Sequence, residues 1–146
     1  MAGVVIVGGG QGGFQTAVSL RAEGYEESIT LIGEEAHLPY QRPPLSKGML
    51  LGKQEERHAI LRPTDFFSAQ RIELSTGERV TSIDRERRTV MLAPGGSVAY
   101  EYLVLATGAR NRTLPAPPRA PSSVELSQLR SQPCPACAPP RRLPVR

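Results

Sequence analysis

The pattern of apolar and polar positions at the start of the chain predicts a strand, a tight turn and a helix. Four apolar residues at positions 4–7 run into a cluster of glycines, and an amphipathic segment follows that ends at Gly24. A short apolar run suits a buried strand, and glycine commonly ends a helix. A second apolar run at residues 29–32 completes the pattern. This order predicts a βαβ start, and therefore an α/β fold with a parallel sheet.

Later apolar segments predict a short helix and further strands. Phe66 and Phe67 fall in a predicted helix capped by Thr64 or Asp65, and we interpret both rings as core. A second short helix is expected after Pro44, where proline favours the first helical turn. The remaining predictions are strands at residues 72–75 and 80–83, a glycine-turn hairpin at 88–92 and 97–100, and a central parallel strand at 102–105.

The glycines after the first strand have the spacing G-x-G-x-x-G of a dinucleotide-binding turn. In this pattern Gly8 permits the turn, Gly10 lets the backbone approach a pyrophosphate, and Gly13 lets the helix pack on the strand. The helix N-terminus then offers free N–H groups and the positive end of its dipole to the phosphates. Glycine-rich turns are common, so the motif predicts nucleotide binding only because a predicted strand precedes it and a predicted helix follows it.

An acidic residue follows the second predicted strand at the position expected for a ribose ligand. Glu34 lies 21 residues after Gly13. Taken alone, Glu34 could equally be a solvated loop acid. In this order of elements, its carboxylate is predicted to bond ribose hydroxyls and to repel a 2′-phosphate. The bound adenosine is therefore expected to belong to FAD or NAD, and NADP is disfavoured at this site.

Prolines stiffen the next segment, residues 37–47, which carries two cations, Arg42 and Lys47. It could be an ordinary surface loop, or it could lie along the cofactor and bring positive charge to it. Together with residues 4–10 and 31–35, its Pro-Tyr-Gln-Arg-Pro-Pro-Leu-Ser-Lys sequence resembles the N-terminal FAD domain of the NAD(P)H-dependent ferredoxin reductases. This is the family of putidaredoxin reductase and rhodocoxin reductase, within the pyridine nucleotide-disulfide oxidoreductases.

The resemblance runs through about residue 112 and implies a Rossmann-like FAD-binding domain with an added β-hairpin, present here in incomplete form. It implies that Lys47 lies near the flavin ring and is the residue closest to catalysis, and that Val80 touches the adenine through its backbone. The predicted cofactor-binding residues are Gly8, Gly10, Gln11, Gly12, Gly13, Glu34, Arg42, Lys47, Val80, Ala106, Thr107 and Gly108.

The family resemblance implies an oxidoreductase that passes electrons from NAD(P)H through FAD to a ferredoxin-type iron–sulfur protein. Residues 36–52 contain no cysteine, so a dithiol relay in that segment is excluded. The alternative is a nucleotide-binding remnant without redox activity. We expect the chain by itself to be inactive, because no second glycine motif for NAD is present.

Composition divides the chain near Arg110. Residues 1–110 carry a net charge of −1 and residues 111–146 one of +5, so the basic balance gives no reason to expect nucleic-acid binding by the folded part. The predicted domains are an FAD-binding domain at 1–112 and a Pro/Arg-rich disordered tail at 113–146. A frameshift would produce such a boundary, and a genuine tail is the alternative.

Several other functions find no support in the sequence. Cys134 and Cys137 form a C-x-x-C motif, but its proline flanks provide neither the strand nor the helix of a thioredoxin-like site. No metal site is predicted, because His37 and His58 lack metal-ligand spacing. No apolar run approaches the roughly 20 residues that span a membrane, and no signal peptide precedes the first strand, so a cytoplasmic protein is expected.

Overall fold

The computed structural model describes residues 3–93 and 95–109 and divides the chain into two compact units. The first unit contains residues 3–41 and 60–109. The second includes Arg42–Ala59. The predicted tail at 113–146, with its C-x-x-C motif, lies outside the described residues.

A parallel sheet forms the centre of the first unit, as the βαβ pattern predicts. It contains β1 (Val4–Val7), β2 (Ile29–Gly33), β3 (Ile72–Thr76) and β7 (Tyr102–Leu105), in the order β3-β2-β1-β7. Each adjacent pair is parallel. The prediction that β7 is a central strand is wrong for the described residues, because β7 pairs only with β1. Leu105 on this edge strand is accordingly 60% exposed.

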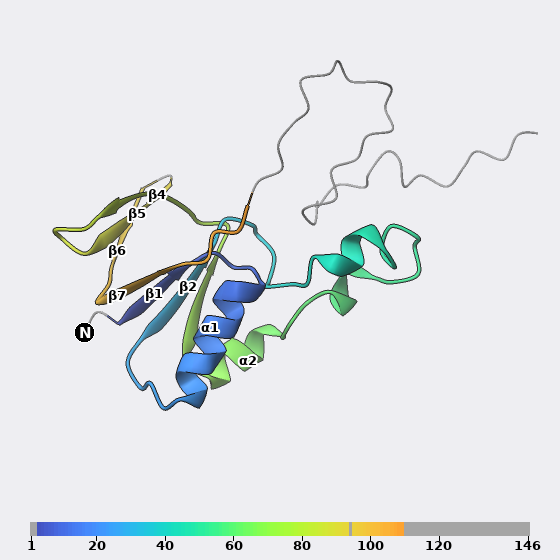
Figure 1. Ribbon diagram of the computed structural model, residues 1–146, viewed down its shortest axis with the longest axis horizontal. Coiled ribbons are helices and arrows are strands. Elements are labelled where there is room, and N and C mark those ends of the chain that lie inside the picture. The colour runs from blue at the N-terminus through green and yellow to red at the C-terminus, as the bar shows by residue number, and fades with distance from the viewer. Residues whose placement is uncertain (1–2, 94, 110–146) are drawn as a thin grey trace, which may run out of the picture. The chain divides into compact units, whose positions relative to one another are not determined.

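The two faces of the parallel sheet are covered by different layers (Figure 1). Side chains alternate along a strand, so Val4 and Ile6 of β1 face one way and Val5 and Val7 the other. The first pair packs with α1 (Gln11–Ala22) and α2 (Thr64–Ala69) around Phe67, which is 1% exposed. The second pair packs beneath the antiparallel strands. The ring centroids of Phe66 and Phe67 are 5.8 Å apart. As predicted, Phe67 belongs to the core, and Phe66 packs against it.

The predicted hairpin is part of a three-stranded antiparallel sheet. Its strands are β4 (Arg79–Asp84), β5 (Thr89–Ala93) and β6 (Ser97–Ala99), in sequence order. The register between β4 and β5 shifts between Val80 and Ser82, which marks a β-bulge. Such bulges bend a strand and re-aim its side chains.

The helix ends show one prediction confirmed and one wrong. Gly24, with φ of 84°, follows the last turn of α1, and its N–H donates to the carbonyl of Arg21 at 3.1 Å. In contrast, neither Thr64 nor Asp65 caps α2. Its N-cap is Pro63, and Thr64 is already the first helical residue, without a side-chain cap.

The side chain of Arg21 makes several hydrogen bonds at the C-terminal end of α1. The Arg21 guanidinium donates to the carbonyls of Glu27, Gln70 and Arg71 at 2.7–2.8 Å, and also to that of Tyr25. These carbonyls come from the α1–β2 connection and from the α2–β3 junction. One side chain therefore ties together two connections that are distant in sequence.

Two short 3₁₀ helices lie in the second unit, η1 (Pro43–Ser46) and η2 (Glu56–His58). The first confirms the short proline-initiated helix. Sequence patterns did not predict the second, in which the backbone N–H of Glu55 donates to Nδ1 of His58 at 3.3 Å. His58, to which the sequence assigned no role, therefore closes a capping box.

Candidate functional site

The glycine turn connects the carboxyl end of β1 to α1, and close backbone packing dictates two of its glycines. Gly8 has a φ of 123°, and a Cβ there would lie 2.1 Å from the carbonyl oxygen of Ala106. A Cβ at Gly13 would lie 2.0 Å from the carbonyl oxygen of Gly8. Neither position can hold a side chain without moving the backbone. Gly13 therefore allows the first turn of α1 to pack on the end of β1.

Gly10 is a glycine for a different reason, since a Cβ there would meet nothing within 4 Å. It is the N-cap of α1, with an extended conformation and no side chain that could cap the helix, and the first turn contains no acidic residue. The N–H groups and the positive dipole end of α1 are thus left for an external anion. A turn with open space and an uncapped helix start fits the pyrophosphate of a dinucleotide.

The end of β7 lies against the same turn. The N–H of Ala106 donates to the carbonyl of Val7 at 2.8 Å, and the Ala106 Cβ lies 3.9 Å from a Cβ position at Gly12. Thr107 and Gly108 follow, both exposed, and Gly108 has a φ of 69°. The structure therefore brings together the predicted residues of the glycine turn and the end of β7. Their contact with FAD stays a prediction.

Two adjacent acids at the end of β2 have different surroundings. Glu34 is exposed, and its Oε1 lies 3.7 Å from Nε of Arg79. Glu35 is half-buried and accepts a hydrogen bond of 2.6 Å from the hydroxyl of Tyr40, a buried residue. Thus Glu35 holds the following loop, and Glu34 is the exposed carboxylate of the two.

Backbone hydrogen bonds fix the segment that carries Arg79. The N–H of Glu78 donates to the carbonyl of Gly33 at 2.9 Å, and the N–H of Gly77 donates to that of Glu35 at 3.0 Å. The β3–β4 turn is thereby attached to the end of β2. Sequence reasoning missed Arg79 because these contacts join segments more than 40 residues apart, which no local pattern reports.

Comparison with known proteins identifies the family. Residues 2–133 match the pyridine nucleotide-disulphide oxidoreductase family. The chain belongs to this family. Rhodocoxin reductase from Rhodococcus erythropolis is 48% identical over 114 residues, which cover 78% of this chain and 27% of that protein.

Solved structures of family members agree with the fold. The crystal structure of the ferredoxin reductase for the CYP199A2 system from Rhodopseudomonas palustris matches with a TM-score of 0.76 and 51% identity, over 80% of this chain and 29% of that one. The covalent putidaredoxin reductase–putidaredoxin complex matches with a TM-score of 0.75 and 46% identity, over 78% and 27%. The chain thus spans about a quarter of the length of these relatives. The ferredoxin–NAD(+) reductase subunit of the benzene 1,2-dioxygenase system of Pseudomonas putida is 46% identical over 114 residues, which cover 78% of this chain and 28% of that protein.

The remaining predicted site residues lie apart from the glycine turn in the chain. Val80 is half-buried and packs against the core beneath β4–β6, next to the bulge. Arg42 and Lys47 are exposed residues of the second unit, at the two ends of η1. The predicted FAD contacts of all three residues, and the catalytic role of Lys47, stay predictions.

The part of the chain that the structure describes contains neither a cluster of metal ligands nor a membrane-spanning helix. Within residues 3–93 and 95–109, no group of three His, Cys, Asp or Glu residues could hold a metal ion. None of the helices in these ranges is long and apolar enough to cross a membrane.

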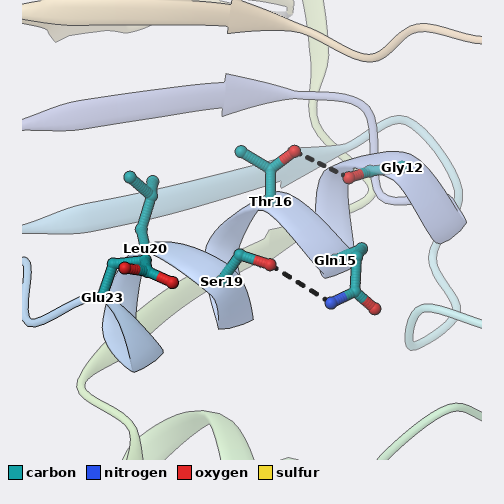
Figure 2. Close-up of a pocket in the computed structure, with 6 residues that line it drawn as sticks. All are labelled: Gly12, Gln15, Thr16, Ser19, Leu20 and Glu23. Atoms are coloured by element: carbon teal, nitrogen blue, oxygen red, sulfur yellow. Dashed lines mark hydrogen bonds between the residues drawn. The ribbon is translucent and has the colours of Figure 1, made fainter.

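A pocket of about 460 Å³ is lined by residues of α1 (Figure 2). Gly12 is the only predicted cofactor-binding residue among its lining residues, which are Gly12, Gln15, Thr16, Ser19, Leu20 and Glu23. Within the helix, the Thr16 hydroxyl donates to the carbonyl of Gly12 at 2.9 Å, and the Gln15 amide donates to the Ser19 hydroxyl at 3.2 Å. We do not assign this pocket to the cofactor.

Proposed function

We propose that this chain is the FAD-binding N-terminal part of an NAD(P)H-dependent ferredoxin reductase. The observation that carries the proposal is the glycine turn, in which Gly8 and Gly13 exclude a Cβ through backbone contact and Gly10 faces open space at an uncapped helix start. A turn shaped only by packing would need glycine at positions 8 and 13 and would tolerate a side chain at Gly10. The open position is what a pyrophosphate requires.

The names of the similar proteins support the reaction class. Rhodocoxin reductase and the ferredoxin–NAD(+) reductase subunit of the benzene 1,2-dioxygenase system of Pseudomonas putida are 48% and 46% identical to this chain. When bound, FAD would accept a hydride from NAD(P)H and release two electrons singly to a ferredoxin-type iron–sulfur protein. The cytoplasmic location stays a prediction.

The residues of this chain would bind and orient the cofactor. The glycine turn and the N-terminus of α1 would hold the pyrophosphate, and Glu34 would accept hydrogen bonds from the adenosine ribose. Ala106–Gly108 would border the cofactor, and Lys47 would set the charge near the flavin. NADP remains disfavoured at this site, because Glu34 would repel a 2′-phosphate.

Binding of FAD tests the proposal directly. Glu34→Ala should weaken FAD about 10- to 100-fold, because a hydrogen bond to an ionised acceptor contributes roughly 1.5–3 kcal/mol. Gly10→Val would place a side chain where the pyrophosphate approaches and should also weaken FAD. Glu26→Ala, an exposed acid in the α1–β2 connection, is the matched control. Equal FAD affinity by calorimetry in all four proteins would refute the proposal.

The alternative, a nucleotide-binding remnant without redox activity, is tested by kinetics. Hydride transfer needs the nicotinamide about 3–3.5 Å from the flavin in a productive geometry. Since the chain spans about 27% of its relatives, we propose that the nicotinamide is held by parts beyond this sequence. Stopped-flow reduction of FAD by NADH should then proceed at the rate of free FAD. An acceleration of a hundredfold or more would mean that the chain builds a hydride-transfer site by itself.

A further inference from the structure

The ion pair at the end of β2 joins the predicted ribose ligand to a cation from another strand. Nε of Arg79 lies 3.7 Å from Oε1 of Glu34, and the two side chains are 56% and 55% exposed. An exposed pair at this distance contributes little to folding stability. Its position at the carboxyl end of a parallel strand, where ligands of α/β sheets bind, suggests a role in recognition.

The surrounding structure holds the pair in this place. Backbone bonds of 2.9 and 3.0 Å from Glu78 and Gly77 attach the start of β4 to the end of β2. Val80 packs into the core beneath the antiparallel sheet, so Arg79, which precedes it in the strand, faces the opposite side. The guanidinium is therefore presented next to Glu34 by an anchored strand.

We propose that Glu34 and Arg79 form a ribose-selecting pair, in which Glu34 binds the ribose hydroxyls and Arg79 is the positioning residue for its carboxylate. This inference rests on the proposed function and deepens it. NAD-binding α/β proteins use an acid to bind the ribose 2′-hydroxyl, whereas NADP-binding ones use a nearby arginine to accommodate the 2′-phosphate. Here both groups are present, and the acid engages the arginine. Without Glu34, Arg79 would be available to bind a 2′-phosphate through its planar fork of donors.

Two small ligands test the pair without a flavin. ADP carries the free ribose hydroxyls, and adenosine 2′,5′-bisphosphate carries a phosphate at the 2′ position. The wild type should prefer ADP, and Glu34→Ala should reverse that preference. The double variant Glu34→Ala/Arg79→Gln should lose the acquired affinity for the bisphosphate by about tenfold or more, because a charged phosphate contact is lost.

The single Arg79 variants separate positioning from charge. Arg79→Gln should weaken ADP about two- to fivefold, the range expected for an exposed ion pair, and Arg79→Lys should restore part of the loss. Arg85→Gln, an exposed arginine in the same β4–β5 region, is the control and should change neither ligand. For each protein, the affinities for ADP and for adenosine 2′,5′-bisphosphate are compared as a ratio. A change in the folded fraction affects both affinities equally and therefore leaves this ratio unchanged.

The outcomes distinguish this inference from the proposed function. Failure of the wild type to bind ADP and FAD would refute the proposed function itself. If the wild type binds ADP and Glu34→Ala weakens that binding, the proposed function holds and the Arg79 variants test only the role of Arg79. Unchanged ADP affinity in Arg79→Gln, with equal bisphosphate binding by Glu34→Ala and the double variant, would then overturn the role of Arg79. If Glu34→Ala prefers the bisphosphate over ADP and the double variant loses this preference, the role of Arg79 is supported. A purely structural role of Arg79 cannot produce such a change in ligand preference.

Discussion

A side chain on Gly8 would collide with the backbone of Ala106, 98 residues later, because its Cβ would lie 2.1 Å from the Ala106 carbonyl oxygen. The N–H of Ala106 also donates to the carbonyl of Val7 at 2.8 Å. The glycine turn and the end of β7 are therefore one packed structure. The turn has a folding role at Gly8 that is separate from any ligand.

We expect Gly8→Ala and Gly10→Ala to have different effects on stability. Gly8→Ala should lower the free energy of unfolding by about 2–5 kcal/mol, because a positive φ and a backbone clash both cost energy. Gly10→Ala has open space and an ordinary φ of −85°, and should cost about 1 kcal/mol or less as an N-cap change. Urea unfolding monitored by circular dichroism measures both. Similar losses in the two variants would contradict the division of roles.

Tyr40→Phe should destabilise the first unit without altering its shape. The variant removes the hydroxyl that donates to Glu35 at 2.6 Å, and a hydrogen bond to an ionised acceptor contributes roughly 1.5–3 kcal/mol. Tyr102→Phe is the matched control, because Tyr102 is 58% exposed and its change should stay within about 0.5 kcal/mol. The same urea titration compares the two, and equal midpoints would show that the Tyr40 bond contributes nothing.

Tyr25→Phe should remove part of the alkaline loss of stability. Burial raises the pKa of the Tyr25 hydroxyl above its ordinary value of 10.0, and the carboxylates of Glu101 and Glu27 add to the effect. Above about pH 10 the unfolded chain releases this proton and the folded chain keeps it, so stability falls as pH rises. The Tyr25 hydroxyl is also buried without a hydrogen-bond partner among the described residues. Replacing it should therefore cost little at pH 7.

Thermal melts of Tyr25→Phe and of the wild type between pH 8 and pH 11 check this prediction. We expect the Tyr25→Phe curve to fall less steeply above pH 10 than the wild-type curve. Identical slopes would show that Tyr25 does not titrate differently in the folded and unfolded states.

The predicted boundary near residue 112 lies beyond the described residues and can be tested by truncation. A chain ending at Arg112 should keep the melting temperature and FAD affinity of the full chain, because the composition of residues 113–146 cannot bury enough apolar surface to offset ordering entropy. A lower melting temperature in the shortened chain would assign those residues to the fold.

Local patterns were sufficient for most elements. The strands at β1 and β2, the helix between them and the Gly24 terminus follow from hydrophobic period and glycine chemistry, which act over a few residues. The Thr64 cap was predicted wrongly, because Pro63 took the N-cap position and Thr64 entered the helix. A cap depends on where the helix begins, and boundaries are the least certain part of a local pattern.

The sequence by itself determined the family, the βαβ start and the candidate glycines, because spacing along the chain is sufficient for each. Only the tertiary structure decided that Gly8 packs on Ala106, that β7 lies at the edge of the described sheet, and that Arg79 reaches Glu34. These relationships join segments separated by 45 residues or more. They arise from strand order and backbone packing, which no local periodicity encodes.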